Sequence, residues 1–156
     1  MKKTLILGVG NYLLSDDGLS VHVLERLQAD NLIPDSIQMI DGGTCGLDLL
    51  QYLEGVSNLI IIDAIKTRDG TPGSIVRLDG DQIPAYLSLK ISPHDIGLPD
   101  LLATAKLRDL YPENIVAFGI QPASLELGVE LSPEVAANVE ALIELIKKEV
   151  TELILI

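Results

Sequence analysis

Four acidic residues stand at or just beyond the ends of three short apolar runs: Asp16, Asp17, Asp41 and Asp63. The runs cover residues 4–9, 37–41 and 59–62, and their composition is typical of buried strands. Ligands of open α/β sheets bind beyond the carboxyl ends of the strands, where the strand order reverses. If the three strands are neighbours in the common order 2-1-3, then Asp41, Asp63 and one of the two adjacent acids converge on one edge.

His94 could complete such a site with an imidazole nitrogen. It lies in the segment KISPHDIG, residues 90–97, between Pro93 and Pro99. One histidine and two carboxylates suit Ni²⁺, Zn²⁺ or Mn²⁺, and open coordination positions would admit water or a substrate group. The other histidine, His22, falls in a predicted helix away from its apolar positions, so we expect it to be solvated.

The four acids also have structural interpretations. Asp16 and Asp17 could begin a helix behind Ser15, where anions favour the positive end of the helix dipole. Asp41 precedes two glycines and could shape a turn, and Asp63 could cap the turn that follows its strand. The structural interpretation is weakest for Asp63, because an unpaired carboxylate at the end of so apolar a strand would be costly.

Other motifs point to different chemistry. The sequence Gly8-Val9-Gly10 after the first run resembles the start of a dinucleotide-binding loop, but Leu13 stands where the third glycine is needed. The two acids that follow would also repel a pyrophosphate. Cys45 could act as a thiol nucleophile, although a packed, inert cysteine is the more frequent use of this residue. Neither a Walker A nor a G-x-S-x-G sequence occurs.

The elements that must position these residues alternate between strands and helices. Beside the three runs, strands are predicted at 74–79, as an edge or antiparallel strand, and at 114–119. Helices are predicted from Leu19 through Leu27, over 46–53, over 99–110, and from the cap at Ser132 through Val150, with a loop at 92–97. This order predicts an α/β fold: a doubly wound, mostly parallel sheet of about five strands with helices on both faces, in a single domain over 1–156.

Composition narrows the function classes. Hydrophobic residues make up 47% of the 156 positions but aromatics only 3%, so Leu, Ile and Val must form the core. Eleven basic and 23 acidic residues give a net charge of −12, which argues against binding to nucleic acid or to anionic membranes. A single cysteine excludes an intrachain disulfide and a multi-cysteine zinc site. No apolar stretch is long enough for a membrane span or a signal segment, so we expect a cytoplasmic protein.

Five segments carry a resemblance to one known family, in order along nearly the whole chain: LGVGNYLLSDDG (7–18), DGGTCGLDLL (41–50), IIIDAI (60–65), KISPHDIGLPDLL (90–102) and VAFGIQPASLELGVELSP (116–133). With them the chain resembles the hydrogenase maturation endopeptidases, the C-terminal processing proteases of the nickel–iron hydrogenase large subunit. The resemblance implies a doubly wound α/β fold. It also implies an enzyme that removes a short C-terminal extension once nickel has been inserted.

The same resemblance implies roles for individual residues. The metal-contacting side chains of the family correspond to Asp17, Asp63 and His94. Many relatives carry Glu where this chain has Asp17, so the shorter side chain must bring the metal closer to the backbone or bind it through water. Substrate choice and cleavage are associated in the family with a D-G-G-T motif, here Asp41, Gly42, Gly43 and Thr44.

Two mechanisms fit this resemblance. In the favoured one the nickel is supplied by the substrate, although other divalent metals could substitute, and Asp17, Asp63 and His94 grasp it. In the other the protease carries its own metal and activates a water. The general base stays open between Asp16 and Asp41. The expected partner is the nickel-loaded precursor, and the protein is expected to be a monomer. The alternatives are a noncatalytic precursor-binding factor and a nucleotide-binding oxidoreductase.

Overall fold

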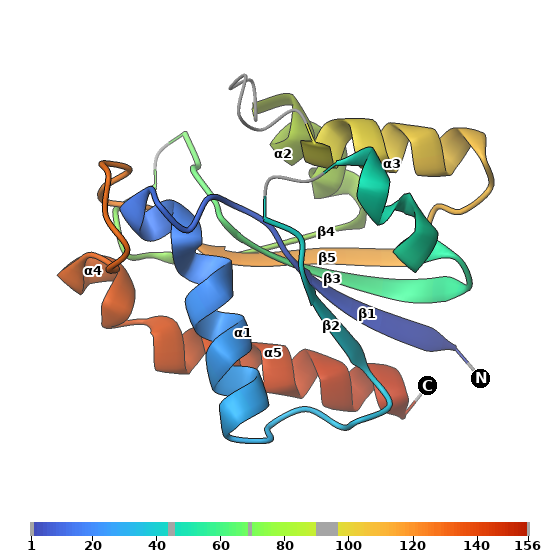
Figure 1. The fold of residues 1–156 in the computed structure, drawn as a ribbon, viewed down its shortest axis with the longest axis horizontal. Coiled ribbons are helices and arrows are strands. Elements are labelled where there is room, and N and C mark those ends of the chain that lie inside the picture. Colours follow the sequence, from blue (N-terminus) through green and yellow to red (C-terminus); the bar gives the residue numbers. More distant parts are fainter. Residues whose placement is uncertain (1, 44–45, 69, 90–96, 156) are drawn as a thin grey trace.

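A five-stranded sheet lies at the centre of the computed structural model, which describes residues 2–43, 46–68, 70–89 and 97–155 (Figure 1). The strand order is β2-β1-β3-β5-β4; β4 is antiparallel to β5, and every other neighbouring pair is parallel. The strands of the described residues are β1 Lys3–Gly8, β2 Gln38–Asp41, β3 Val56–Ala64, β4 Ile75–Asp79 and β5 Asn114–Ile120. The predicted order 2-1-3 and the antiparallel edge strand are both confirmed.

Helices cover both faces of the sheet, as predicted (Figure 1). On one face lie α1 Leu19–Ala29 and α5 Val139–Ile154, and on the other lie α2 Ile83–Leu89 and α3 Gly97–Leu107. The shorter helices of the described residues are α4 Pro133–Ala136 and the 3₁₀ turns η1 Ser15–Gly18, η2 Leu47–Leu53 and η3 Gly80–Gln82. Within the described ranges no helix combines the length and the apolar character that crossing a membrane requires.

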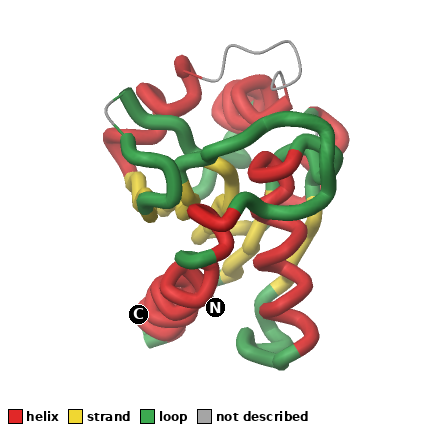
Figure 2. Tube along the Cα trace, turned by 90° about the vertical axis from the view of Figure 1, so that its left-hand side faces the viewer, coloured by secondary structure: helices red, strands yellow, loops and turns green. Residues whose placement is uncertain are grey.

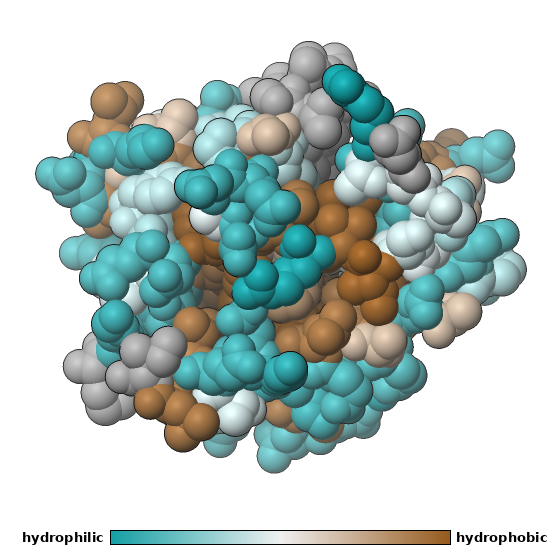
Figure 3. All heavy atoms as spheres, turned by 180° about the vertical axis from the view of Figure 1, so that it is seen from behind, coloured by the Kyte–Doolittle hydropathy of each residue, from teal (hydrophilic) through white to brown (hydrophobic). Residues whose placement is uncertain are grey.

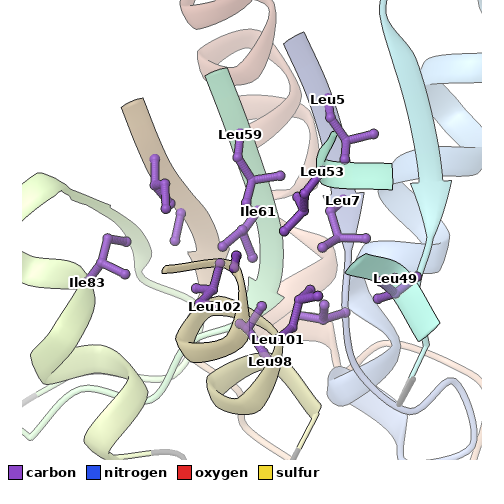
Figure 4. Packing of buried hydrophobic residues seen from close by; sticks show 14 of the residues in the cluster. Leu5, Leu7, Leu49, Leu53, Leu59, Ile61, Ile83, Leu98, Leu101 and Leu102 are labelled. Atoms are coloured by element: carbon purple, nitrogen blue, oxygen red, sulfur yellow. The ribbon is translucent and has the colours of Figure 1, made fainter. Parts of the chain in front are cut away.

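Alternate residues of the strands supply two apolar layers, because successive side chains of a strand point to opposite faces. Leu7 and Ile61 pack with Leu101 on the side of α2 and α3 (Figure 4). Ile6 packs with Ile143 on the side of α1 and α5. Seen from behind, the surface is mostly hydrophilic, with apolar side chains reaching it in the middle of that face (Figure 3). The core consists largely of Leu, Ile and Val, as the composition predicts.

The helices differ from the sequence-based expectation in three places. The sequence does not predict α2, because prolines interrupt residues 84–97; Pro84 is in fact the second residue of this helix, where its missing N–H costs nothing. Residues 47–53 form a 3₁₀ turn rather than an α-helix. Ser132 caps α4 by accepting a hydrogen bond from the Val135 N–H, but the helix then breaks at Asn138, whose side-chain amide donates to the Gly73 carbonyl. A tertiary contact therefore sets the start of α5.

Candidate active site at the carboxyl edge of the sheet

The carboxyl ends of β1, β2 and β3 meet at one edge of the sheet, on the side that faces the viewer in Figure 2. Gly8 at the end of β1 pairs with Asp41 of β2 on one side and with Ile62 of β3 on the other. Beyond the strand, the Gly10 N–H donates to the Gly43 carbonyl at 2.9 Å. The predicted convergence of these three strand ends is confirmed, and the loop after β1 lies against the end of β2.

Asp63 follows Ile62 and is completely buried, with 0% of its surface exposed. The alternation along β3 directs its side chain to the side of α2 and α3, the side on which Ile61 packs. There the hydroxyl of Tyr86, a buried residue of α2, donates a hydrogen bond to the Asp63 Oδ2. Burying a carboxylate costs free energy unless it accepts hydrogen bonds or binds a cation. The hydrogen bond from the Tyr86 hydroxyl meets part of this requirement and fixes the position of the Asp63 side chain.

Tyr86 is a residue that sequence reasoning misses. The signal for it is weak: an aromatic side chain with a polar tip stands three residues after the buried Ile83 in an otherwise apolar segment. A buried tyrosine usually has a hydrogen-bond partner for its hydroxyl, but the sequence does not say which residue that partner is.

Asp17 is fixed against the start of the loop that follows β1. Its Oδ2 accepts a hydrogen bond from the Asn11 N–H at 2.7 Å, and the side chain is half-buried. Gly10 makes this approach possible, because a Cβ on that residue would lie 2.1 Å from the Asp17 carbonyl oxygen, and its φ of +126° is one that other residues rarely adopt. The second glycine of Gly8-Val9-Gly10 thus serves the placement of Asp17.

Asp16 points the other way, into the protein, and is fully buried. Its carboxylate accepts hydrogen bonds from the Ala123 N–H (2.8 Å), the Ser124 N–H (2.9 Å), the Ser132 N–H (2.7 Å) and the Ser132 hydroxyl (2.8 Å). Burial would raise the pKa of Asp16, but these hydrogen bonds outweigh it and hold the pKa below its ordinary value. Both carboxylate oxygens therefore serve to join the loop after β1 to residues 123–132.

Ser15 does not cap the helix that begins here, unlike in the structural interpretation of the sequence. Ser15 has a φ of +53°, and no side chain caps η1. Its hydroxyl donates instead to the Glu126 carbonyl at 2.6 Å. Asp16 and Asp17 do lie in the first turn of η1, where the sequence places a helix start, but Ser15 and Asp16 form their side-chain hydrogen bonds with residues 123–132 rather than with this helix.

Asp16→Asn should lower the free energy of unfolding at pH 7 by about 2–3 kcal/mol, because charge-assisted hydrogen bonds are lost and an amide NH₂ is brought against N–H donors. The lowered pKa means that Asp16 stabilises the fold above the unfolded-state pKa of about 3.9 and that this contribution disappears as the pH falls through the lower folded-state pKa. Urea unfolding between pH 7 and pH 3 should show the gap between wild type and variant closing below about pH 4. Exposed Asp35→Asn is the control and should change the stability little at either pH; an equal loss in both variants would contradict the assignment.

Asp41 ends β2 and is exposed. Its Oδ1 accepts a hydrogen bond from the Gly43 N–H at 3.1 Å, which is the turn-shaping role that the sequence allows. Gly42 donates to the Gly8 carbonyl at 2.8 Å and so ties this turn to β1. Because Asp41 and Ile62 both pair with Gly8, Asp41 lies about two strand spacings, or roughly 10 Å, from β3. The strand alternation also directs Asp41 and Asp63 to opposite faces, so the two carboxylates do not form a pair.

The remaining predicted residues lie outside the described part of the chain. These are Thr44, Cys45 and His94. The other histidine, His22, is half-buried rather than solvated: its Nε2 is 3.1 Å from the Val129 carbonyl, and its ring lies 5.6 Å from that of Tyr12. Within residues 2–43, 46–68, 70–89 and 97–155, no three His, Cys, Asp or Glu side chains form a cluster that could hold a metal. Asp17 and Asp63 are the two described members of the predicted metal-contacting set.

Comparison with known proteins shows to which family this chain belongs. The family model for hydrogenase maturation protease (HycI) matches residues 21–149. The hydrogenase 2 maturation protease of Escherichia coli is 37% identical over 142 residues, which cover 91% of this chain and 87% of that protein. The chain belongs to the hydrogenase maturation protease family.

Solved structures agree with this assignment. The hydrogenase maturating endopeptidase HybD from E. coli superposes with a TM-score of 0.88 at 36% identity, covering 96% of this chain and 93% of that one. The maturation protease HybD from Thermococcus kodakarensis superposes with a TM-score of 0.78 at 31% identity, covering 95% and 99%. The protein is therefore a hydrolase, an endopeptidase of hydrogenase maturation, as the resemblance implies. The oxidoreductase and the noncatalytic alternatives are set aside.

Proposed function

We propose that this protease removes a C-terminal extension from the precursor of a nickel–iron hydrogenase large subunit after nickel has been inserted. Asp17, Asp63 and His94 contact the nickel that the precursor brings, and the protease holds no metal of its own. Another divalent ion can substitute for nickel only when the precursor itself carries it. The protease acts as a monomer on this one partner.

The observation that carries the proposal is the position of Asp63. A fully buried carboxylate stands at the carboxyl end of β3, next to the end of β1, after which the loop holding Asp17 begins. Two carboxylate oxygens and one imidazole nitrogen bind borderline divalent ions such as Ni²⁺ with moderate affinity, which ligands from the precursor can complete. The two helices before and after residues 90–96, α2 and α3, cover the face of the sheet toward which Asp63 points, which is compatible with a contribution from His94.

Hydrolysis of the scissile amide adds one water: its oxygen bonds to the carbonyl carbon, the C–N bond breaks, and a proton reaches the departing amine. With Asp16 engaged in four hydrogen bonds, Asp41 is our candidate for the group that accepts the proton of the attacking water. It is exposed at the same edge of the sheet and is followed by Gly42 and Gly43, where a peptide backbone can approach closely. Asp41 to Thr44 would contact the substrate around the scissile bond.

The direct test is to incubate the purified protein with the nickel-loaded large-subunit precursor encoded in the same genome and to record intact masses. The precursor should lose one C-terminal peptide, and the two products together should exceed the precursor by the mass of one water. Protein unfolded by heat before mixing is the control. An unchanged precursor after incubation with folded protease would contradict the proposal.

A further inference from the structure

Two loops at the carboxyl edge of the sheet expose a group of apolar side chains to solvent. They come from residues 10–15, after β1, and from residues 121–132, after β5, and we call them the two-loop surface: Tyr12, Leu13, Leu125, Leu127 and Val129. Leu127 is 86% exposed and Leu13 58% exposed. The two segments, blue and orange, lie on the left of Figure 1 and toward the viewer in Figure 2.

The backbones of the two loops are bound directly to each other. The Ser15 N–H donates to the Gly128 carbonyl at 2.8 Å, and the Gly128 N–H donates to the Leu13 carbonyl at 2.9 Å. The Ser15 hydroxyl adds a bond to the Glu126 carbonyl. These bonds form a small parallel bridge between segments more than 100 residues apart. The exposed leucines are therefore held in defined positions.

Hydrogen bonds of Asp16 hold the same two loops together. Its N–H donates to the Ser124 carbonyl at 3.1 Å, and its carboxylate accepts from the N–H groups of Ala123 and Ser124. The next residue in the chain is Asp17. The two-loop surface is thus tied by adjacent residues to a proposed nickel contact, and it extends the proposed active site on one side.

Within the two loops themselves the charged side chains are all acidic, although exposed Lys66 and Arg68 lie in the loop after β3, which contacts Gln121 through Thr67. Glu126 and Glu130 are exposed and Asp17 is half-buried, while residues 9–18 and 121–132 contain no Lys or Arg. The whole chain carries a net charge of −12. An apolar patch with an acidic rim fits a partner segment that is apolar and flanked by basic side chains. A second copy of this chain fits poorly, because it would bring the same acidic rim against this one.

We propose that the two-loop surface docks an apolar segment of the hydrogenase large-subunit precursor that is flanked by Lys or Arg. This inference rests on the proposed function, because it names the surface by which the same substrate is held beside Asp17. The side chains that make the contact are Leu13, Leu125 and Leu127, with Glu126 and Glu130 at the rim.

Leu127→Ser and Leu107→Ser form a matched pair. Leu107 ends α3 at the opposite end of the sheet from the two loops and is 87% exposed, so both changes remove the same side chain from the same degree of exposure (Figure 1). With nickel-loaded precursor, Leu127→Ser should raise KM about tenfold, the loss expected when one buried leucine contact is removed, while Leu107→Ser leaves KM and kcat unchanged. Leu13→Ser should act like Leu127→Ser. A KM equal to that of the Leu107→Ser control, or a fall in kcat alone, would overturn the proposal.

Charge is tested with the double variant Glu126→Gln and Glu130→Gln. KM should rise about threefold at low salt, and the difference from wild type should shrink as sodium chloride is raised. An unchanged KM at low salt would overturn the basic character assigned to the partner segment. Sedimentation of the wild type tests the second copy: a dimer that Leu127→Ser dissociates without changing KM would assign the surface to self-association and overturn the proposal.

Binding is measured separately by titrating the nickel-loaded precursor into each protein. If the wild type binds the precursor but does not cleave it, the proposed function fails, and the docking inference is then decided by whether Leu127→Ser weakens that binding. If cleavage occurs and Leu127→Ser binds as well as Leu107→Ser, docking fails while the function stands.

Discussion

Asp63→Asn should lower the rate of precursor cleavage by at least about 100-fold. Loss of a partner that merely orients a metal ligand costs about 10–100-fold, and loss of the contact itself should cost more. The fold should persist, because Asn at this position keeps a carbonyl oxygen. That oxygen can still accept the hydrogen bond from the Tyr86 hydroxyl. Cleavage is followed by intact mass, and folding by circular dichroism and by the midpoint of thermal unfolding.

Asp17→Asn and His94→Ala should lose cleavage to a similar extent, since each removes one of the three proposed nickel contacts. Asp35→Asn, an exposed residue just before β2, makes the same chemical change away from the carboxyl edge and should keep full activity. Full activity in any of the three site variants would remove that residue from the proposed site. Unfolding of all three would show that these side chains serve stability and would contradict the assignment of a shared site.

Nickel-free precursor should not be cleaved, whereas nickel-loaded precursor should be cleaved to completion by the same sample of protease. In the proposed mechanism, nickel is what Asp17, Asp63 and His94 contact, so without it the precursor lacks its main anchor. Treating the protease with a chelator, and then removing the chelator before mixing, should not change the rate. Two carboxylates and a single imidazole, with water in the remaining coordination positions, hold a divalent ion only moderately, so the purified protease should contain none.

A metal analysis of the purified protease distinguishes this mechanism from the resident-metal one. The matched arm adds zinc to the protease and offers it the nickel-free precursor, which should remain intact. One tightly bound metal per chain whose removal abolishes cleavage would contradict the substrate-nickel mechanism and favour a metalloprotease. Cleavage of the nickel-free form at the rate of the loaded form would contradict it as well.

The strand ends show how much of the fold can be predicted from the local sequence pattern. The apolar runs at 4–9, 37–41 and 59–62 are short, with acids at their ends or in the loop beyond, and strands of this kind are parallel and buried when helices separate them. The order 2-1-3 comes from the common doubly wound sheets rather than from these residues, and the meeting of three strand ends follows once that order is assumed. The helix α2 could not be predicted in this way, because the prolines in residues 84–97 argue against a helix. The helix accommodates Pro84 because this residue lies in its first turn.

By itself, the sequence determined the α/β fold class, the edge at which three strand ends meet, and the family through five motifs in order. The local pattern alone could not separate Asp16 from Asp17, because two adjacent acids have the same pattern, and only the family resemblance assigned the metal contact to Asp17. The tertiary structure shows how their surroundings differ: Asp16 turns inward to the N–H groups of residues 123–132, and Asp17 stays at the edge, held by Asn11. The partner of Asp63 was decided in the same way, since Tyr86 reaches it from 23 residues away. Hydrogen bonds of this kind join segments that only the folded chain brings together, so no local spacing encodes them.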